Sequence, residues 1–236
     1  MAYLFQQIFY KPLFNILVFF YQTISLHDLG IAIILTTILI RLILYPFFHK
    51  GAKQQMLMQR IQPKVKEIQE RHKGDTQKQS EALMALYKEH GVNPFSSILL
   101  LLIQLPIMLA FFWVVRSGLG TSQFVNLYSF VSAPQSVNTM FLGIIDLTKP
   151  SIIVILCAAA AQFFQARLAI YKTAGNGQPS AAEKIAQQMS FVGPLVTIAI
   201  FYSLPSAIGL YWLVTSLFSM VQQYLVNRHL KEKYGN

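Results

Sequence analysis

The apolar run Leu29–Phe48, LGIAIILTTILIRLILYPFF, constrains this chain most, because it carries an arginine, Arg41, inside a stretch long enough to cross a membrane. A helix of about 20 apolar residues matches the ~30 Å hydrocarbon thickness of a bilayer. An arginine near mid-membrane costs about 2.5 to 3.5 kcal/mol on insertion scales, so such residues usually face a polar or wet interior. Thr37 and Tyr45 lie one helical turn before and after Arg41, and we expect the three side chains to share one face. The run therefore predicts a first membrane span with a polar stripe centred on Arg41.

A plainer explanation of Arg41 stays open at this point. The residue lies about seven positions from the Phe48 end of the run, or about 11 Å at 1.5 Å per residue. Its long side chain could extend along the helix toward the membrane surface, as buried lysines and arginines often do. The shared polar face favours a functional role, and snorkelling alone is the alternative.

The composition indicates a polytopic membrane protein rather than a soluble domain. Hydrophobic residues make up 54% of the chain and charged residues only 12%, and the mean hydropathy is positive. The formal net charge is +10, but the basic residues lie between hydrophobic runs and do not alternate with aromatic residues on one soluble surface. We therefore interpret the charge as a topology signal and expect no specific recognition of nucleic-acid sequences. The lone Cys157 can form no intramolecular disulfide.

Hydropathy predicts five membrane spans. After Leu29–Phe48 they are Phe95–Val115, Ser151–Tyr171, Ile185–Tyr202 and Ala207–Val226. An odd number of spans puts the two ends of the chain on opposite sides of the membrane. With the N-terminus outside, fifteen of the 19 lysines and arginines fall on the inner side. The positive-inside rule therefore predicts an outer N-terminus and a cytoplasmic C-terminus.

Three segments flank or connect these spans. Residues 1–27 mix apolar, aromatic and polar side chains without a cleavage pattern, which favours an interfacial amphipathic helix; an uncleaved anchor is the alternative. Residues 50–92 are charged and show helical spacing on both sides of Gly74-Asp75, which predicts a cytoplasmic helical hairpin rather than a plain connecting loop. Residues 227–236 form a short basic tail. The predicted fold is thus all-α, with an N-terminal segment 1–27 and a five-helix core 28–236.

Uncharged polar residues recur inside the predicted spans. Gln104 lies in the second span, and Gln162 and Gln165 share a face of the third. In the fifth, a stripe at helical spacing is flanked by further polar residues; the stripe is Trp212, Ser216, Ser219 and Gln223, and the flanking residues are Tyr211, Thr215 and Gln222. Each amide or hydroxyl alone is equally compatible with simple helix–helix adhesion.

No aspartate or glutamate lies in any predicted span, so Arg41 has no carboxylate partner there. A guanidinium among hydroxyls and amides predicts a hydrated groove open to the cytoplasm, which would favour polar or acidic stretches of another polypeptide. We expect no catalytic residue, metal or cofactor. The predicted groove residues are Arg41, Thr37, Tyr45, Gln104, Gln162, Gln165, Tyr211, Trp212 and Ser216.

The order of four segments resembles the YidC-type membrane insertase family. They are GIAIILTTILIRLILYPFF, a charged hairpin containing RIQPKVKEIQERHKGD, LLLIQLPIMLAFF, and LPSAIGLYWLVTSLFSMVQQ, and the resemblance covers Gly30 to Gln223. It implies a five-helix core whose water-accessible groove is open to cytoplasm and lipid and closed to the exterior. It also implies that Arg41 is the groove arginine, that Thr37 is the polar position one turn before it, and that Trp212 touches substrate.

The resemblance extends to the flanking segments. The hairpin resembles the cytoplasmic hairpin required for insertion, and Gln162 falls near a polar groove position of the third helix. The basic tail resembles a ribosome-contacting tail but is short. We expect a bacterial plasma-membrane member without the large periplasmic domain of some relatives.

The resulting hypothesis is an insertase that passes nascent hydrophobic segments into the bilayer without nucleotide hydrolysis. Its expected partners are nascent membrane proteins and the lipid bilayer, with the ribosome and a Sec-type translocon as further candidates. An ion channel or small-solute transporter using Arg41 as an anion site is the alternative, although the chain shows no internal repeat. An intramembrane enzyme is disfavoured, because H-E-x-x-H and G-x-S-x-G motifs and acidic span residues are absent from the sequence.

Overall fold

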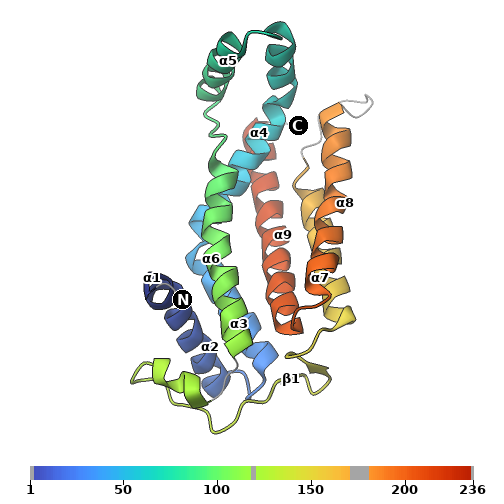
Figure 1. The fold of residues 1–236 in the computed structure, drawn as a ribbon. Helices are drawn as coiled ribbons and strands as arrows, with labels where there is room; N and C mark the ends of the chain where they lie inside the picture. The colour runs from blue at the N-terminus through green and yellow to red at the C-terminus, as the bar shows by residue number, and fades with distance from the viewer. Residues whose placement is uncertain (1–2, 118–120, 171–180, 235–236) are drawn as a thin grey trace.

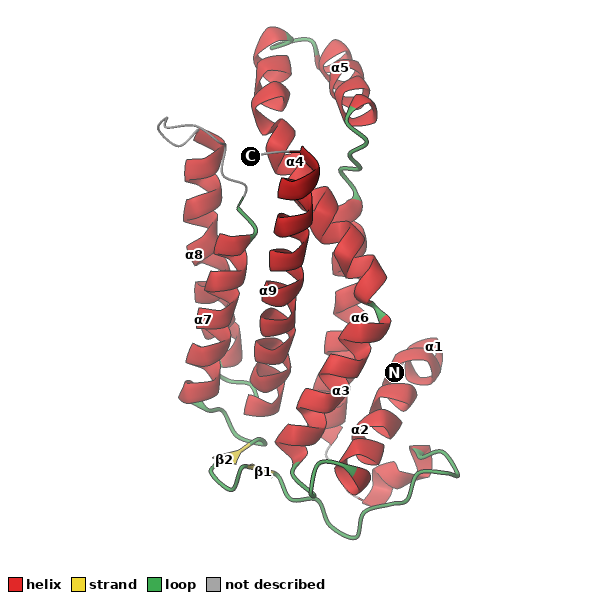
Figure 2. Cartoon of the chain, turned by 180° about the vertical axis from the view of Figure 1, so that it is seen from behind, coloured by secondary structure: helices red, strands yellow, loops and turns green. Residues whose placement is uncertain are grey.

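The computed structural model describes residues 3–117, 121–170 and 181–234, and these are mostly helical (Figures 1 and 2). The helices are α1 (Tyr3–Phe5), the π-helix η1 (Gln6–Tyr10), α2 (Lys11–Thr23), α3 (Leu29–Ile43), α4 (Tyr45–Arg71), α5 (Thr76–Glu89), α6 (Ser96–Ser117), the 3₁₀-helix η2 (Thr121–Asn126), α7 (Ile152–Leu168), α8 (Ala181–Phe201) and α9 (Ser206–Tyr234). Two short strands, β1 (Met140–Phe141) and β2 (Ile145–Asp146), pair antiparallel. The predicted all-α class is therefore the observed one.

Helix α9 lies at the centre of the bundle. It packs against α3 on one side and α7 on the other, with α8 against α7 and α6 beside α4 (Figures 1 and 2). Small residues permit the close approach of α7 and α9: Ala158 and Ala161 are buried, and a Cβ added at Gly209 would lie 3.0 Å from Val154 Cγ1. Small side chains at such contacts let helix backbones approach closely within a membrane.

The first predicted span, Leu29–Phe48, is not one straight helix, and its crossing of the membrane stays a prediction. Helix α3 begins with Asp28 as its N-cap, whose Oδ1 accepts a hydrogen bond from Ile31 N at 3.0 Å, and it ends at Ile43. Helix α4 then leaves at an angle of 70°. Pro46 explains the break, because proline has no N–H and its ring clashes with the carbonyl four residues earlier in a continuous helix.

Helices α4 and α5 form the two arms expected within residues 50–92, and they lie at the end of the molecule farthest from β1 (Figure 1). Their contact is a small apolar cluster that includes Ile61, Val65 and Leu86. Asp75 caps α5 by accepting a hydrogen bond from Lys78 N at 3.0 Å. The first arm begins at Tyr45, earlier than predicted, because α4 continues directly from the bend.

The C-terminal residues predicted as a short basic tail are helical as far as they are described. Helix α9 continues to Tyr234, so residues 227–234 extend α9 beyond the predicted fifth span. Asn227 fixes part of this extension, because its Nδ2 donates to Leu168 O at 2.8 Å.

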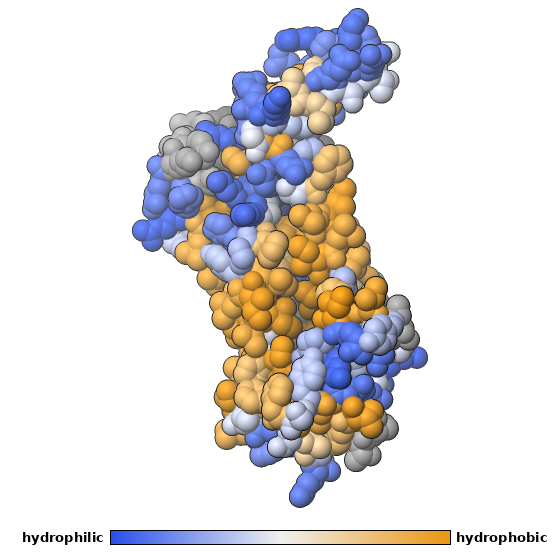
Figure 3. Space-filling view, turned by 90° about the vertical axis from the view of Figure 1, so that its left-hand side faces the viewer, coloured by the Kyte–Doolittle hydropathy of each residue, from blue (hydrophilic) through white to orange (hydrophobic). Residues whose placement is uncertain are grey.

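Span length bears on the predicted topology. Among the described helices, α6 over Ile98–Ser117 is long and apolar enough to cross a membrane by itself, and the bent pair α3–α4 could supply a second crossing. Helix α7 and the Ser190–Phe201 part of α8 are shorter apolar helices. A broad apolar surface separates the polar hairpin end from the mixed opposite end (Figure 3). The count of five spans stays a prediction.

The N-terminal segment is helical and packs against the bundle. Leu13, Phe14 and Leu17 of α2 are buried, and they belong to the main hydrophobic cluster. Asn15 holds the segment after η2, since its Nδ2 donates to Asn126 O at 3.0 Å and its Oδ1 accepts from Tyr128 N at 2.6 Å. An interfacial position at the outer leaflet stays a prediction.

The segment between β2 and α7 caps the beginning of α9. Ser206 N donates to Lys149 O at 2.9 Å, and Ala207 N donates to Leu147 O at 3.1 Å. Ser206 Oγ also donates to Asp146 O at 3.1 Å. The first N–H groups of a helix lack partners within the helix, so these carbonyls satisfy them and fix the end of α9.

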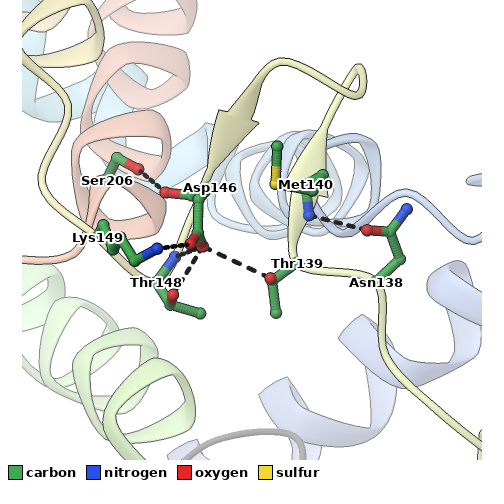
Figure 4. A network of polar contacts seen from close by, with 7 residues as sticks. All are labelled: Asn138, Thr139, Met140, Asp146, Thr148, Lys149 and Ser206. Carbon is green, nitrogen blue, oxygen red and sulfur yellow. Dashed lines mark hydrogen bonds and ion pairs between the residues drawn. The ribbon is translucent and has the colours of Figure 1, made fainter.

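The carboxylate of Asp146 organises this segment (Figure 4). Its Oδ1 accepts from Thr148 Oγ1 at 2.7 Å and from Thr148 N at 3.0 Å, and its Oδ2 lies 3.0 Å from Lys149 Nζ. The Thr148 hydroxyl, then Lys149 and the Thr148 amide lower the pKa of Asp146 to about 2 from its usual 3.8.

We expect Asp146→Asn to lower the melting temperature at neutral pH, because the amide carries no charge for Lys149 and offers only one acceptor oxygen. A carboxyl whose pKa is lower in the folded state contributes stability that is complete above its unfolded value. That contribution is lost as the pH falls from 3.8 through about 2. The difference in melting temperature between wild type and Asp146→Asn should therefore shrink over this range. A difference that does not change with pH would contradict this role of the carboxylate.

Candidate functional site: a buried arginine between α3 and α9

Arg41 lies on the last turn of α3 with only 5% of its surface exposed. Its Nη2 donates to Thr215 O at 3.1 Å and to Ser219 Oγ, so the guanidinium connects α3 to α9. The ring of Phe48 lies 4.1 Å from the guanidinium carbon, and the ring of Phe218 lies 5.6 Å from it. The cation is thus enclosed by one carbonyl, one hydroxyl and two aromatic rings.

The hydrogen-bonding capacity of Arg41 is only partly used. Its Nε and Nη1 are buried and have no hydrogen-bond partner. Thr215 Oγ1 and Trp212 Nε1, both on α9, are also buried without a partner. Buried polar groups normally have hydrogen-bond partners, because leaving one unsatisfied costs about 1–3 kcal/mol. The cost is higher when the group is charged. These groups could therefore bind water or the polar groups of a bound polypeptide.

The face of α9 that meets α3, α4 and α6 differs from the predicted stripe. It consists of Tyr211, Thr215, Ser219 and Gln222, which follow one another at helical spacing. Gln104 Nε2 donates to Tyr211 OH, and the Tyr211 ring stacks on Phe111 with centroids 4.4 Å apart. Tyr211 and Thr215, which the sequence placed beside the stripe, are therefore central to this face, and Ser219 is the stripe member that reaches Arg41.

Trp212 lies on α9 about two helical turns before Ser219. Its ring meets Phe201 edge-on with centroids 5.7 Å apart and packs against the cluster of Ile155 and Ile208. Trp212 therefore contacts α7 and α8 at its own level of the helix, and its predicted role in the groove stays a prediction. Ser216 is 2% exposed, and no contact brings it to the guanidinium.

Gln162, one of the two predicted groove residues of α7, makes its contact with α8. Thr197 Oγ1 of α8 donates to Gln162 Oε1, so this amide connects α7 to α8. A Cβ added at Gly193 would lie 3.2 Å from Gln162 Nε2, which shows how closely α8 approaches it. Gln165 lies one turn later on α7, and its backbone carbonyl accepts from Ala169 N at 3.1 Å.

Thr37 and Tyr45, which were predicted to share a face with Arg41, make their contacts with other groups. Thr37 is fully buried, and its hydroxyl donates to Ile33 O at 2.7 Å within α3. Tyr45 lies beyond the bend, where its ring stacks on His49 with centroids 5.4 Å apart and its carbonyl accepts from Gln222 Nε2 at 3.2 Å. The 70° bend lies between Arg41 and Tyr45, so the two residues stand on different helices, and a shared stripe through Tyr45 stays a prediction.

Phe48 and Phe218 were missed by the sequence analysis. Pro46 could have indicated the contact of Phe48, because a proline bends the helix before the end of the apolar run and so changes which later side chain lies against Arg41. Phe218 lies three residues after Thr215, at the spacing that places it on a neighbouring face of α9. Within residues 3–117, 121–170 and 181–234, no group of His, Cys, Asp or Glu is arranged to hold a metal ion.

Comparison with known proteins decides the family. The model of the family described as "60Kd inner membrane protein" matches residues 19–233. The chain belongs to this family. The match includes the bent α3–α4 unit, the hairpin and all of α6 and α7, so the resemblance found from the sequence is confirmed.

Curated proteins that are similar to this chain in sequence carry the name "Membrane protein insertase YidC". One from Syntrophobacter fumaroxidans is 31% identical over 93% of this chain and 38% of its own length, and one from Wolinella succinogenes is 33% identical over 95% and 38%. One from Fusobacterium nucleatum is 33% identical over 84% of this chain and 86% of its own length. The chain thus spans less than two fifths of the first two relatives.

Membership in the 60Kd inner membrane protein family places the chain among bacterial inner-membrane proteins. Its relatives carry the name of an insertase and not that of an enzyme. The apolar outer surface of α6 agrees with this location, because Leu101, Leu102 and Leu105 are exposed where a soluble helix would bury them.

Proposed function

We propose that this chain inserts nascent membrane proteins into the bacterial inner membrane, using the surroundings of Arg41 as a hydrophilic groove open to the cytoplasm. The observation that carries the proposal is a buried guanidinium that keeps two unpartnered donors, Nε and Nη1. Such donors match the carbonyls or carboxylates of a polypeptide segment that must cross the membrane, because these groups would otherwise lose their own hydrogen bonds to water.

The energetics need no nucleotide. Burial of a client's apolar surface in lipid contributes roughly 25 cal/mol per Å². The polar groove lowers the cost of desolvating the short flank that precedes the apolar segment. Leu42 and Ile43 are exposed directly after Arg41 on α3, so a segment leaving the groove would meet an apolar surface at once.

The proposed topology has five spans, with the N-terminus outside and the C-terminus in the cytoplasm. Helices α4 and α5 then lie in the cytoplasm, where their basic residues meet arriving clients, and the 137–149 segment closes the outer end of the bundle. The ribosome and a Sec-type translocon are proposed as further partners, and the proposed mechanism uses no cofactor.

Site-specific photocrosslinking tests the proposal. A photoreactive residue at Ser219, beside Arg41, or at Trp212, facing α7 and α8, is placed in the protein in membranes, and ribosome-bound nascent chains carrying one hydrophobic segment are added. We expect adducts at Ser219 as the segment emerges. Ile144, which is 77% exposed on the β-hairpin, serves as the control position and should give none at that stage. Adducts at Ile144 but not at Ser219 would contradict the proposed entry route, and Trp212 adducts would show that the path extends to α7 and α8.

A further inference from the structure

A cavity of about 240 Å³ lies away from Arg41, at the end of the bundle where α3 begins and α6 ends. It is bounded by α2, α3, α6, the segment around β1 and β2, and the first residues of α9. Its floor is aliphatic and buried, and consists of Leu17, Leu29, Ile33, Val114, Leu147 and Ala207. The insertase mechanism proposed above makes no use of this cavity.

The mouth of the cavity differs from its floor. The remaining lining residues that are partly or fully exposed are Val115, Val137, Thr139 and Thr148. Two of these, Thr139 and Thr148, carry hydroxyls that donate to Asp146 Oδ1 at 3.5 and 2.7 Å and keep their lone pairs free, whereas the side chains of the floor carry only carbon. The cavity therefore has the amphipathic profile of a site for a molecule with an apolar tail and a polar head.

Size and chemistry exclude water as a suitable occupant of the floor. An engineered apolar cavity of about 150 Å³ stays dry and binds benzene, and a buried water needs two to four polar partners. The present cavity is larger, and its buried floor offers no polar side chain. A hydrocarbon chain is the occupant that would restore the dispersion contacts that an empty cavity loses.

The bilayer is the source of such a chain. Val115 belongs to the outer end of α6, whose neighbouring side chains Leu109 and Trp113 are exposed on the apolar surface of the bundle. The mouth is therefore continuous with the surface that meets lipid. Arg116 follows Val115, is exposed, and stacks on Phe112 at 5.7 Å, which leaves its charge available to a phosphate at the membrane surface.

We propose that this cavity binds one acyl chain of an anionic phospholipid, with its phosphate near Arg116. The bound chain would contact α2 on one side and α3, α6 and α9 on the others. It would thereby hold the N-terminal segment against the bundle and fill the space behind the residues that cap α9.

Photoactivatable lipid tests the proposal on the full chain in bilayers. Vesicles of phosphatidylethanolamine and phosphatidylglycerol receive a trace of phosphatidylglycerol with a diazirine at the end of one acyl chain, and adducts are mapped by mass spectrometry. We expect adducts on Ile33 and Leu147, which are 0% exposed, as well as on exposed Leu102 of α6. Adducts on Leu102 with none on Ile33 or Leu147 would overturn the proposal.

Two substitutions make the test specific. Ala207→Phe fills the floor, and Val137→Phe obstructs the mouth from a segment outside the packed helices. Each should abolish the adducts at Ile33 and retain those at Leu102, which report that α6 is in the bilayer. Persistence of Ile33 adducts in a variant that retains Leu102 adducts would contradict this site.

Arg116→Gln separates the anionic headgroup from lipid in general. With the phosphatidylglycerol probe, this variant should lose part of the Ile33 signal, whereas a phosphatidylcholine probe should give a weak signal in wild type and variant alike. Equal Ile33 signals from the two lipids in wild type would overturn the assignment to an anionic lipid.

Discussion

Arg41→Ala should reduce the insertion of a single-span client with an acidic N-terminal tail by roughly tenfold or more. The substitution removes the charge and the unpartnered donors Nε and Nη1 together. A hydrogen bond to a charged group contributes about 1.5–3 kcal/mol, and 1.4 kcal/mol corresponds to a factor of ten. Arg41→Lys should retain most of the insertion, because it keeps a cation at this position. The measurement is the protease-protected fraction of the client in proteoliposomes.

Controls separate this effect from loss of structure, since Arg41 also joins α3 to α9 through Thr215 O and Ser219 Oγ. Ser219→Ala removes only the hydroxyl acceptor and should preserve insertion. A client with a neutral tail should be inserted by Arg41→Ala better than the acidic one. Equal insertion of the acidic client by wild type and Arg41→Ala would count against the mechanism.

Phe111→Ala should be the most destabilising of the substitutions considered for the bundle. Phe111 is 0% exposed and stacks on Tyr211, which in turn accepts a hydrogen bond from Gln104. Truncation of a buried phenylalanine costs about 3–5 kcal/mol, because it removes transfer free energy and leaves a cavity. A domain of this size loses roughly 2–4 °C of melting temperature per kcal/mol, so we expect a decrease of about 6–20 °C.

The matched control for this measurement lies on the same helix. Leu102 is 60% exposed, and Leu102→Ala should change the free energy of unfolding by no more than about 0.5 kcal/mol. Thermal unfolding of both variants in the same detergent gives the comparison. A similar loss of stability in the two variants would show that Phe111 does not hold α6 to α9.

Sequence periodicity was sufficient to place most helices, because apolar runs between polar segments largely determine where a membrane protein is helical. Residues Ile152–Leu168 and Ala181–Phe201 lie within a few positions of the predicted third and fourth spans. The bend before Pro46 was not predicted, because a hydropathy sum treats proline as one more residue of the apolar run and contains no information about the direction of the helix axis. Composition likewise gave no sign that α9 would continue through the basic tail.

The site was predictable in its centre and less so in its surroundings. Arg41 stood out because a charge in an apolar run is costly wherever the run lies. The partners of Arg41 depend on how α9 is rotated, and residues on adjacent faces, such as Trp212 and Tyr211, cannot be distinguished by spacing alone. The rotation is fixed by tertiary contacts, among them the Gln104–Tyr211 hydrogen bond and the edge-on contact of Trp212 with Phe201.

The central claim is that water from the cytoplasm reaches the surroundings of Arg41, and thiol labelling tests it most directly. Thr215→Cys, in a Cys157→Ser background, places a thiol beside Arg41. Thr215 is 8% exposed, and its backbone carbonyl accepts a hydrogen bond from the guanidinium. Ile144→Cys and Leu102→Cys report the outer surface and the lipid-facing surface. We expect a membrane-impermeant maleimide to label Thr215→Cys in inside-out vesicles and not in right-side-out vesicles. A Thr215→Cys thiol that stays unlabelled from the cytoplasmic side, or that is labelled from the outside, would contradict the account.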